Sequence, residues 1–460
     1  MKTVVIIGAG FSGTVLAAQL LQQNLEATRI VLVNRSGLMA RGLAYGTNSV
    51  VHLLNVPAGN MSAYADQPDH FLNYCKLLDP ATTGASFVSR KRYGEYLGFV
   101  LESAERQKKS TVTLERIDAE VAEIHHNSNR IAIKFSDGRF LEADHAVLAL
   151  GNFSPADHLR LGALLGNEHY LLDPWSRIDN DGVIDLDESI LLMGTGLTAL
   201  DTVIKLVQRG HYGPIHMISR RGLSPLPHRK ASTHPPVNKA FIDTMLQCQP
   251  SISNYLKIIR KEIASLQHTE TDWRDIISAV RPVTATLWRS LDAGERSRFL
   301  RHLQPYWDIH RHRVAPMSFD FFEQSCASGQ TSIIAGRIKR ISLLKNRLMI
   351  DIKLRKNQDT STIEVDRIIN CTGPNTNVKW MNEPLIAQLI NSRLVKPDEH
   401  SLGVVVNDDL SLVNRHQNET ATLSYIGPML KATFWEATAV PELRKYAAEL
   451  AALLKLRLSR

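Results

Sequence analysis

The residues with the clearest chemical use lie at the start of the chain, in KTVVIIGAGFSGTVLAAQLL. Gly8, Gly10 and Gly13 form a GxGxxG pattern between an apolar strand-like run and a helix-like run rich in Ala and Leu. Glycines are needed there because the turn is sharp, the backbone must approach a pyrophosphate, and the helix packs closely on the strand. We therefore predict a dinucleotide site with its phosphates at the helix N-terminus, beside Phe11 and Ser12.

The strand that follows, RIVLVNR, ends in Asn34 and Arg35. This is about twenty residues after the glycines, where an acid usually binds the ribose hydroxyls. Asn34 can still accept a hydroxyl hydrogen bond, but as a neutral and weaker acceptor. We expect both residues to contact the cofactor, and the missing acid weakens the case for its tight retention.

The same device occurs again in SILLMGTGLTALDTVIKL. Gly194, Gly196, Thr198 and Ala199 lie between a second strand-like run and a second helix-like run. Two such sites in one chain suit a redox relay, in which a nicotinamide delivers hydride to a second cofactor that is retained.

The strand after the second turn, PIHMISRRG, ends in Ser219, Arg220 and Arg221 rather than in an acid. A hydroxyl and two guanidinium groups are what recognition of a 2′-phosphate requires. We predict NADPH at this site, with NADH possible. The alternative is that the two arginines form a solvated turn.

The remainder of each half also repeats. Each continues through short alternating strands into a buried strand that ends in a glycine, Gly151 in the first half and Gly373 in the second. We assign both glycines to the cofactor sites. The predicted fold class is α/β, with two Rossmann-like dinucleotide-binding domains that each carry an antiparallel meander.

Residues 224–315 interrupt the second unit with runs of apolar residues at three- and four-residue spacing. They predict a helical insert, which we interpret as a substrate lid. The end of the insert gathers rings and cations that suit a flat or anionic substrate, or a clamp on cofactor phosphates. The candidate pocket residues are His302, Tyr306, Trp307, His310, Arg311 and Arg313. Core packing of Trp307 and a solvated face for the arginines remain alternatives, and we predict no metal because no ligand spacing accompanies the histidines.

Composition fits these sites without requiring other partners. A net charge of +8 favours anionic partners, but the basic residues are dispersed through the dinucleotide motifs, so we expect no nucleic acid partner. The four cysteines form no CxxC pair, and no apolar stretch reaches the ~18 residues of a membrane span. We expect a cytoplasmic protein without a membrane partner, and the sequence leaves its oligomeric state open.

Longer strings outside the glycine turns resemble those of the two-dinucleotide-binding-domain flavoproteins. Within them, they are similar to bacterial FAD/NAD(P)-binding proteins related to flavin-dependent monooxygenases of the N-hydroxylating and urate-hydroxylase-like kinds. The strings are residues 42–62, 299–316, 369–374 and 425–444. The resemblance implies FAD in a first domain of residues 1–160 and 365–460, and NAD(P)H in a second domain of residues 161–364.

The resemblance also implies further FAD contacts. Asn55, Val56 and Met61 lie where relatives of this architecture place redox cysteines beside the flavin ring. Toward the C-terminus, Gly427 is expected to end a strand, and a helix is expected to begin near Trp435. We include Gly427, Trp435 and Glu436 among the FAD contacts, with a helix-capping role for Glu436 as the alternative.

The segment LLNVPAGNMS contains no cysteine, which excludes the dithiol relay of disulfide reductases. The resemblance favours electron transfer to oxygen. It implies an enzyme, an NAD(P)H-consuming monooxygenase that hydroxylates a small polar metabolite, either an amine or a planar heterocycle such as urate, through a flavin hydroperoxide. The protein then needs only to shield and position the reactants, and we find no catalytic triad. A peroxide-forming reductase or oxidase and a non-catalytic redox sensor remain the alternatives.

Overall fold

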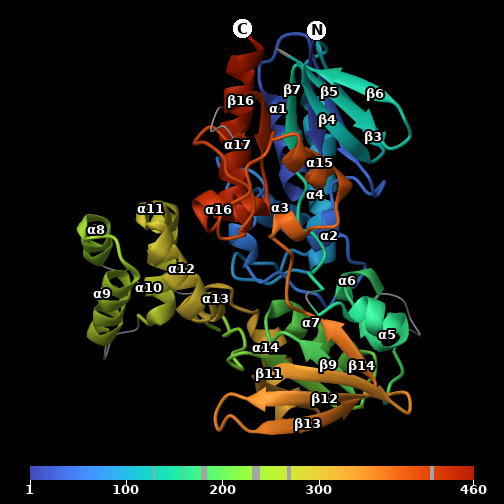
Figure 1. Ribbon diagram of the computed structural model, residues 1–460. Helices are drawn as coiled ribbons and strands as arrows, with labels where there is room; N and C mark the ends of the chain where they lie inside the picture. The colour runs from blue at the N-terminus through green and yellow to red at the C-terminus, as the bar shows by residue number, and fades with distance from the viewer. Residues whose placement is uncertain are drawn as a thin grey trace.

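The computed structural model describes residues 1–127, 130–157, 159–177, 184–230, 239–266, 271–414 and 419–459. Figure 1 shows two sheet-containing lobes stacked one on the other, with both chain termini on the upper lobe and a helical lobe standing out to one side. Within the described ranges, no helix is long and apolar enough to span a membrane. The whole is an α/β fold, as predicted.

The first domain is built on a six-stranded sheet in the order β15-β16-β7-β1-β2-β3. Its strands pair in parallel except at the β15–β16 edge, and the apolar run of β1 is buried because helices and the meander cover the sheet. The strands are β1 (Lys2–Ile7), β2 (Thr28–Asn34), β3 (Val112–Asp118), β7 (His145–Leu148), β15 (Ser411–Val413) and β16 (Glu419–Tyr425). A separate antiparallel meander contains β4 (Val121–Asn127), β5 (Arg130–Phe135) and β6 (Phe140–Ala143).

Helix α1 packs between α4 and α17 and fills the main core with Ala and Leu side chains. The long helices of this domain are α1 (Phe11–Gln22), α3 (His70–Leu78), α4 (Arg90–Gln107), α15 (Pro384–Asn391) and α17 (Val440–Leu458). The short helical turns are α2 (Gly42–Tyr45), η1 (Ala58–Asn60), η3 (Val378–Trp380), η4 (Pro428–Leu430) and α16 (Lys431–Phe434).

The second domain has a seven-stranded sheet in the order β13-β12-β11-β10-β9-β14-β8. Its strands are β8 (Tyr170–Leu171), β9 (Ile190–Met193), β10 (Ile215–Ser219), β11 (Thr331–Leu344), β12 (Arg347–Leu354), β13 (Thr360–Val365) and β14 (Arg367–Asn370). Its helices are α5 (Leu161–His169), α6 (Pro174–Arg177), α7 (Leu197–Gln208) and α14 (Pro316–Ala327). Because β14 pairs with β9 and β8, the second domain extends to residue 370, and the boundary expected at residue 365 is too early.

The second meander differs from the first in how it joins its sheet. Residues 331–335 of β11 pair in parallel with β10, and residues 336–344 of the same strand pair antiparallel with β12. The meander and the parallel sheet therefore share one continuous strand, whereas β4, β5 and β6 form a sheet of their own.

The helical lobe is the predicted insert, and its helices are confirmed. They are α8 (Ala240–Gln247), α9 (Ile252–Ser265), α10 (Trp273–Val280), η2 (Arg281–Val283), α11 (Thr284–Ser290), α12 (Ala293–His302) and α13 (Gln304–Arg311). Side-chain oxygens of Ser251, Asp272 and Asp292 accept hydrogen bonds from the first turns of α9, α10 and α12, so local sequence fixes where these helices begin. The chain enters and leaves the lobe side by side, because Val314 N–H donates to the carbonyl of Leu226 (3.0 Å).

Candidate dinucleotide sites and the helical insert

The first glycine turn has no room for side chains. Gly8 has φ +111°, and a Cβ there would lie 2.2 Å from the carbonyl oxygen of Ala149. A Cβ on Gly13 would lie 1.9 Å from the carbonyl oxygen of Gly8. Gly10 caps α1 without a side-chain hydrogen bond, and the first turn of α1 contains no acid, so its N–H groups suit an anion. The buried Phe11 ring stacks on Tyr93, so Phe11 offers the site its backbone rather than its ring.

The second turn repeats the geometry of the first. Gly194 has φ +119°, and a Cβ there would lie 2.4 Å from the carbonyl oxygen of Cys371. Its N–H donates to Ile218 O over 2.8 Å, as the N–H of Gly8 donates to Val33 O over 2.8 Å.

The residues around the second turn follow the same plan. Gly196 caps α7 as Gly10 caps α1, and the third glycine is replaced by the buried Ala199. Gly151 (φ +69°) lies two residues after Ala149, whose carbonyl contacts the first turn, and Gly373 (φ +89°) lies two residues after Cys371, whose carbonyl contacts the second. A Cβ at either glycine would meet nothing within 4 Å. The duplication predicted from the sequence is therefore confirmed in backbone geometry. Thr198 lies in the first turn of α7, where its carbonyl accepts a hydrogen bond from Thr202.

A small cavity of about 100 Å³ lies beside Gly8 at the end of β2. Asn34 lines it and donates its amide nitrogen to Ser36 (2.9 Å) and to the carbonyl of Leu38 (3.0 Å), which leaves its amide oxygen as an acceptor. Arg35 also lines the cavity and forms an ion pair with Glu383 (2.8 Å) that raises the pKa of the guanidinium. Glu383 could not be predicted as the partner of Arg35, because the two residues are 348 positions apart.

The loop of residues 53–62, which is expected beside the flavin, is hydrogen-bonded to His228 at the base of the insert, where the chain enters that lobe. The carbonyl oxygen of Asn55 accepts a hydrogen bond from Nε2 of His228 (2.9 Å), and Met61 is buried in the first-domain core. Val56 packs half-buried against the same core. Burial, with Arg313 as the next contribution, lowers the pKa of His228 to about 4. His228 is therefore a neutral donor near neutral pH.

The two arginines predicted to bind a 2′-phosphate have different surroundings. Arg220 is exposed at the end of β10. Arg221 donates to the carbonyls of Arg301 (3.1 Å) and His302 (3.2 Å) at the end of α12, and its guanidinium lies over the Tyr306 ring. A cation there complements the negative end of the helix, so Arg221 attaches the insert to the second domain.

The predicted pocket residues of the insert separate into two groups. Tyr306, Trp307 and His310 line a cavity of about 550 Å³ among the insert helices. The lining does not include His302, Arg311 or Arg313, so the six candidate residues do not share this cavity.

Arg311 is the last residue of α13 in the insert, and its guanidinium is 2.9 Å from the carboxylate of Glu436 in the first domain. Trp307 Nε1 donates to the other carboxylate oxygen of Glu436 (3.1 Å). Both charged side chains are more than nine-tenths buried. The capping alternative for Glu436 is wrong, because α17 begins at Val440 and Ala439 is its N-cap.

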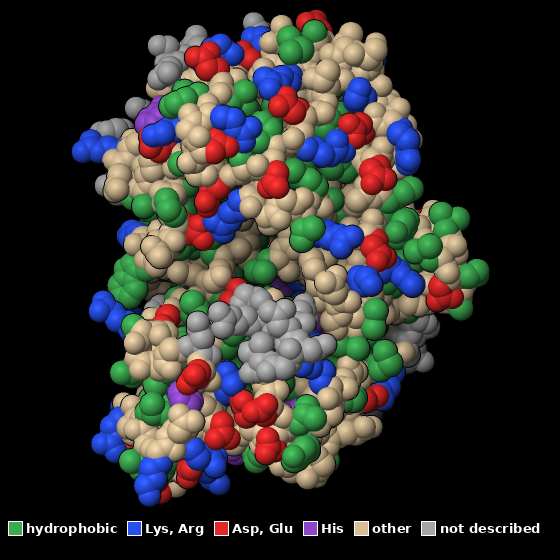
Figure 2. All heavy atoms as spheres, turned by 90° about the vertical axis from the view of Figure 1, so that its right-hand side faces the viewer, with side chains coloured by type: hydrophobic (Ala, Val, Ile, Leu, Met, Phe, Trp, Pro, Cys, Tyr) green, Lys and Arg blue, Asp and Glu red, His purple; other side chains and the backbone are tan. Residues whose placement is uncertain are grey.

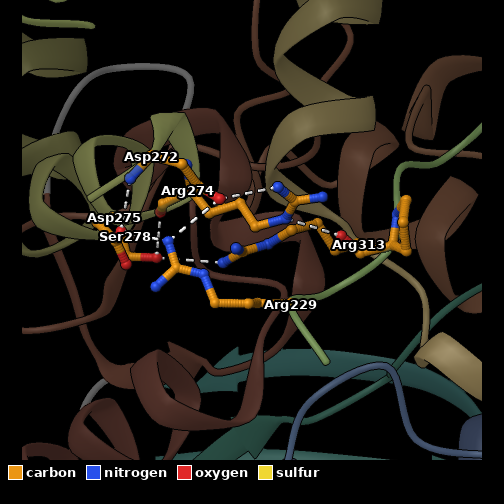
Figure 3. A network of polar contacts seen from close by, with 7 residues as sticks. Arg229, Asp272, Arg274, Asp275, Ser278 and Arg313 are labelled. Atoms are coloured by element: carbon orange, nitrogen blue, oxygen red, sulfur yellow. Dashed lines mark hydrogen bonds and ion pairs between the residues drawn. The ribbon is translucent and has the colours of Figure 1, made fainter. Parts of the chain in front are cut away.

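Arg313 belongs to a polar network at the base of the insert (Figure 3). Its Nη2 donates to Ser278 of α10 (3.1 Å). Beside it, Arg274 donates to the carbonyl of Pro227 (3.0 Å) and pairs with Asp272 (3.0 Å). These bonds join both connecting segments to α10, so they orient the lobe on its base.

Two residues of the C-terminal segment adopt unusual backbone angles. Gly427 has φ +144° at the start of η4, where a Cβ would lie 2.9 Å from the Tyr425 hydroxyl. Trp435 has φ +56° and is buried, with its side chain in the wall of the insert cavity.

A buried ion pair that the sequence did not reveal joins the two domains. Arg90 of α4 donates to Asp201 of α7 over 2.7 Å, and both side chains are mostly buried. Burial raises the pKa of Asp201, against the opposing effect of Arg90. The guanidinium of Arg90 also lies over the Trp175 ring.

Comparisons with known proteins agree with this geometry. Residues 5–153 match a protein-family model described as FAD-NAD(P)-binding. No curated protein matches the sequence. The fold of the whole chain is similar to that of L-lysine 6-monooxygenase from Pseudomonas syringae, at 16% identity, with 99% of this chain and 100% of that chain covered and a TM-score of 0.68.

Two further solved structures share the fold. One is the FAD-bound cadaverine monooxygenase of desferrioxamine biosynthesis from Erwinia amylovora, at 14% identity, with 99% and 94% of the chains covered and a TM-score of 0.65. The other is the ornithine N-hydroxylase of Kutzneria sp. 744, at 12% identity, with 99% of both chains covered and a TM-score of 0.63. Residues 5–153 thus match an FAD-NAD(P)-binding family model, and the fold of the whole chain is similar to that of these three monooxygenases.

Proposed function

We propose that this protein is an FAD-dependent, NAD(P)H-consuming monooxygenase. The observation that carries the proposal is the pair of matching dinucleotide turns at Gly8 and Gly194, one in each domain of a single chain. The loop of residues 53–62, where a dithiol relay would need its cysteines, contains none. Electrons that arrive from a nicotinamide then need an acceptor other than a disulfide.

The residues of the first turn fit FAD. The glycines leave the N-terminus of α1 accessible to a pyrophosphate, and Asn34 keeps an amide oxygen for the ribose hydroxyls. Arg35 is neutralised by Glu383, so it adds little charge at the adenosine end. The second turn fits NADPH in the same way, with Arg220 free to approach a 2′-phosphate.

When bound, FAD would accept hydride from NADPH and supply the reduced flavin that activates oxygen. The protein's own residues would position and shield these groups. The neutral His228 holds the loop at Asn55, and the Arg90–Asp201 pair holds the two domains together. Glu436 joins the first domain to the insert, which we propose as the substrate lobe.

For the substrate, we propose a small polar metabolite, either a primary amine or a planar heterocycle such as urate. Amines are supported by the names of the structural neighbours, which act on lysine, cadaverine and ornithine. Planar heterocycles are supported by the aromatic lining of the insert cavity.

The test is to reduce the purified, FAD-loaded protein with one equivalent of NADPH without oxygen and then to add oxygen. We expect NADPH to bleach the visible flavin absorption. With the right substrate present, we expect oxygen to yield hydroxylated product and less hydrogen peroxide. Peroxide in full yield with every candidate substrate would indicate an oxidase, and no bleaching would indicate a sensor.

A further inference from the structure

The insert encloses a cavity of about 550 Å³, which is large enough for a bicyclic or tricyclic ring system. Its lining comes mainly from α9 to α13, with Trp435 contributed by the first domain. The residues lining it, all within the described ranges, include no Asp or Glu. A buried ammonium group requires a carboxylate or free aromatic faces, and the first of these is absent from this lining.

Four of the aromatic rings in the wall each have a cation of the protein over them. Arg274 lies over Trp273 with 4.4 Å to the ring centroid, and Lys431 lies over Trp435 with 4.3 Å. Two further ring–cation pairs, at 5.2 and 5.4 Å, are Arg296 over Trp288 and Arg221 over Tyr306. None of the four cations lines the cavity, whereas all four rings do, so we infer that the cavity side of each ring is available to a ligand.

These cations leave an excess of positive charge around the cavity, because the carboxylates next to its lining, Glu436 and Glu295, are already paired with Arg311 and Arg298. Arg274 is paired with Asp272, but Arg221 and Arg296 donate to backbone carbonyls, which do not cancel their charge. At the rim, the exposed Arg260 of α9 is the cationic residue of the lining. Such a field repels a second cation and attracts an anion or an electron-rich ring.

We propose that the insert cavity binds a planar aromatic molecule with one anionic group, its rings among the tryptophans and its anion at Arg260. As the substrate lobe, an assignment that rests on the proposed function, this cavity selects planar anionic rings over aliphatic amines. A ligand here contacts Trp307 and Trp435, next to Glu436, so it lies where the insert meets the first domain.

The test is isothermal titration calorimetry of the FAD-loaded protein with naphthoate, naphthylmethylammonium and cadaverine. The first two probes share one ring system and differ in the sign of their charge. We expect naphthoate to bind at least about tenfold more tightly than naphthylmethylammonium, and cadaverine not to bind. Equal or tighter binding of either amine, or no binding of naphthoate, would overturn the proposal.

Three variants locate the site. Arg260→Ala should weaken naphthoate binding about tenfold, and Lys257→Ala, an exposed residue of the same helix outside the lining, should not. Leu256→Trp should fill the cavity and abolish binding while the FAD content stays unchanged. Unchanged binding in Leu256→Trp would place the probe elsewhere and overturn the proposal.

The binding assay contains neither NADPH nor excess oxygen. The two proposals can therefore fail separately. Naphthoate binding without NADPH consumption would contradict the monooxygenase proposal and support the cavity proposal. Hydroxylation of an aliphatic amine without naphthoate binding would support the monooxygenase proposal and contradict the cavity proposal.

Discussion

The carboxylate of Glu436 lies 2.9 Å from the guanidinium of Arg311, and both side chains are more than nine-tenths buried. One belongs to the segment that precedes α17 and the other ends α13, so this pair crosses from the first domain to the insert. Burial lowers the pKa of Arg311, against the opposing effect of Glu436. The insert thus depends on a charge that another domain supplies.

Glu436→Gln should leave Arg311 buried without its counter-charge. Removing one partner of a buried pair typically costs about 3–5 kcal/mol of unfolding free energy. Urea unfolding measures the loss, and limited proteolysis should show the insert becoming accessible. The control is Asp408→Asn, which breaks the exposed Arg289–Asp408 pair between the same two parts and should cost at most about 1 kcal/mol. Equal losses of unfolding free energy in the two variants would contradict the expectation that the buried ion pair contributes more than the exposed one.

Gly8→Ala should abolish flavin retention. The added Cβ would lie 2.2 Å from Ala149 O at a φ of +111°, so the turn must change shape. The ratio of flavin to protein after purification measures the effect. Gly98→Ala is the control, because its Cβ meets nothing within 4 Å in α4 and should stabilise the helix by roughly 0.5–1 kcal/mol. A Gly8→Ala protein that retains its yellow flavin would contradict the assignment of the FAD site to the N-terminal glycine turn.

The two arginines after β10 should respond differently to substitution. Arg220→Ala should raise the KM for NADPH about tenfold and leave the KM for NADH unchanged, because it removes a charged hydrogen bond to the 2′-phosphate. Arg221→Ala should change both constants equally, because that guanidinium binds the carbonyls at the end of α12. Steady-state kinetics with both nucleotides checks this, and a selective effect of Arg221→Ala alone would reverse the assignment.

Stability should fall as the pH is lowered through the range in which His52 differs between folded and unfolded states. Burial, with Arg90 and Lys205 as further contributions, lowers the pKa of His52 to about 3, against about 6.5 in the unfolded chain. Between these two pKa values the unfolded state binds one more proton than the folded state, so the unfolding free energy rises with pH. The contribution of His52 to stability is fully present above about pH 6.5.

His52→Asn should therefore reduce the slope of unfolding free energy against pH by up to roughly 1.4 kcal/mol per pH unit. Urea unfolding between about pH 5 and pH 7 measures this slope. His126→Asn, at an exposed position of β4, should leave it as in the parent protein. The same slope in all three proteins would contradict the contribution of His52.

The sequence predicted what depends on local pattern and missed what depends on long-range contacts. The turns at Gly8 and Gly194 were readable because strand, glycines and helix are contiguous. The partners of Arg35 and Trp307 were not, because Glu383 and Glu436 lie 348 and 129 positions away. The apolar surroundings of Glu436 in the sequence, FWEATAV, were the one local signal of a buried carboxylate. Arg221 was assigned to a phosphate because sequence cannot show that the end of α12 lies beside it.

The net charge of the sequence also could not predict how charged side chains are distributed over the surface. Figure 2 shows Lys and Arg interspersed with Asp and Glu over the face it presents, rather than gathered into one basic field. Part of the excess of positive charge from which we expected anionic partners lies at the insert, where the partly buried Arg296 and Lys431 lie over rings of the cavity wall.

The adjoining entry and exit of the insert make that lobe an exchangeable cassette. Leu226 and Val314 are hydrogen-bonded neighbours, so a short linker between them could replace every helix from α8 to α13 without rerouting a strand of either sheet. Under the proposed function, substrate choice can then diversify in the cassette while the redox core stays the same. Such an exchange must also replace Glu436, because the excised lobe would take Arg311 with it.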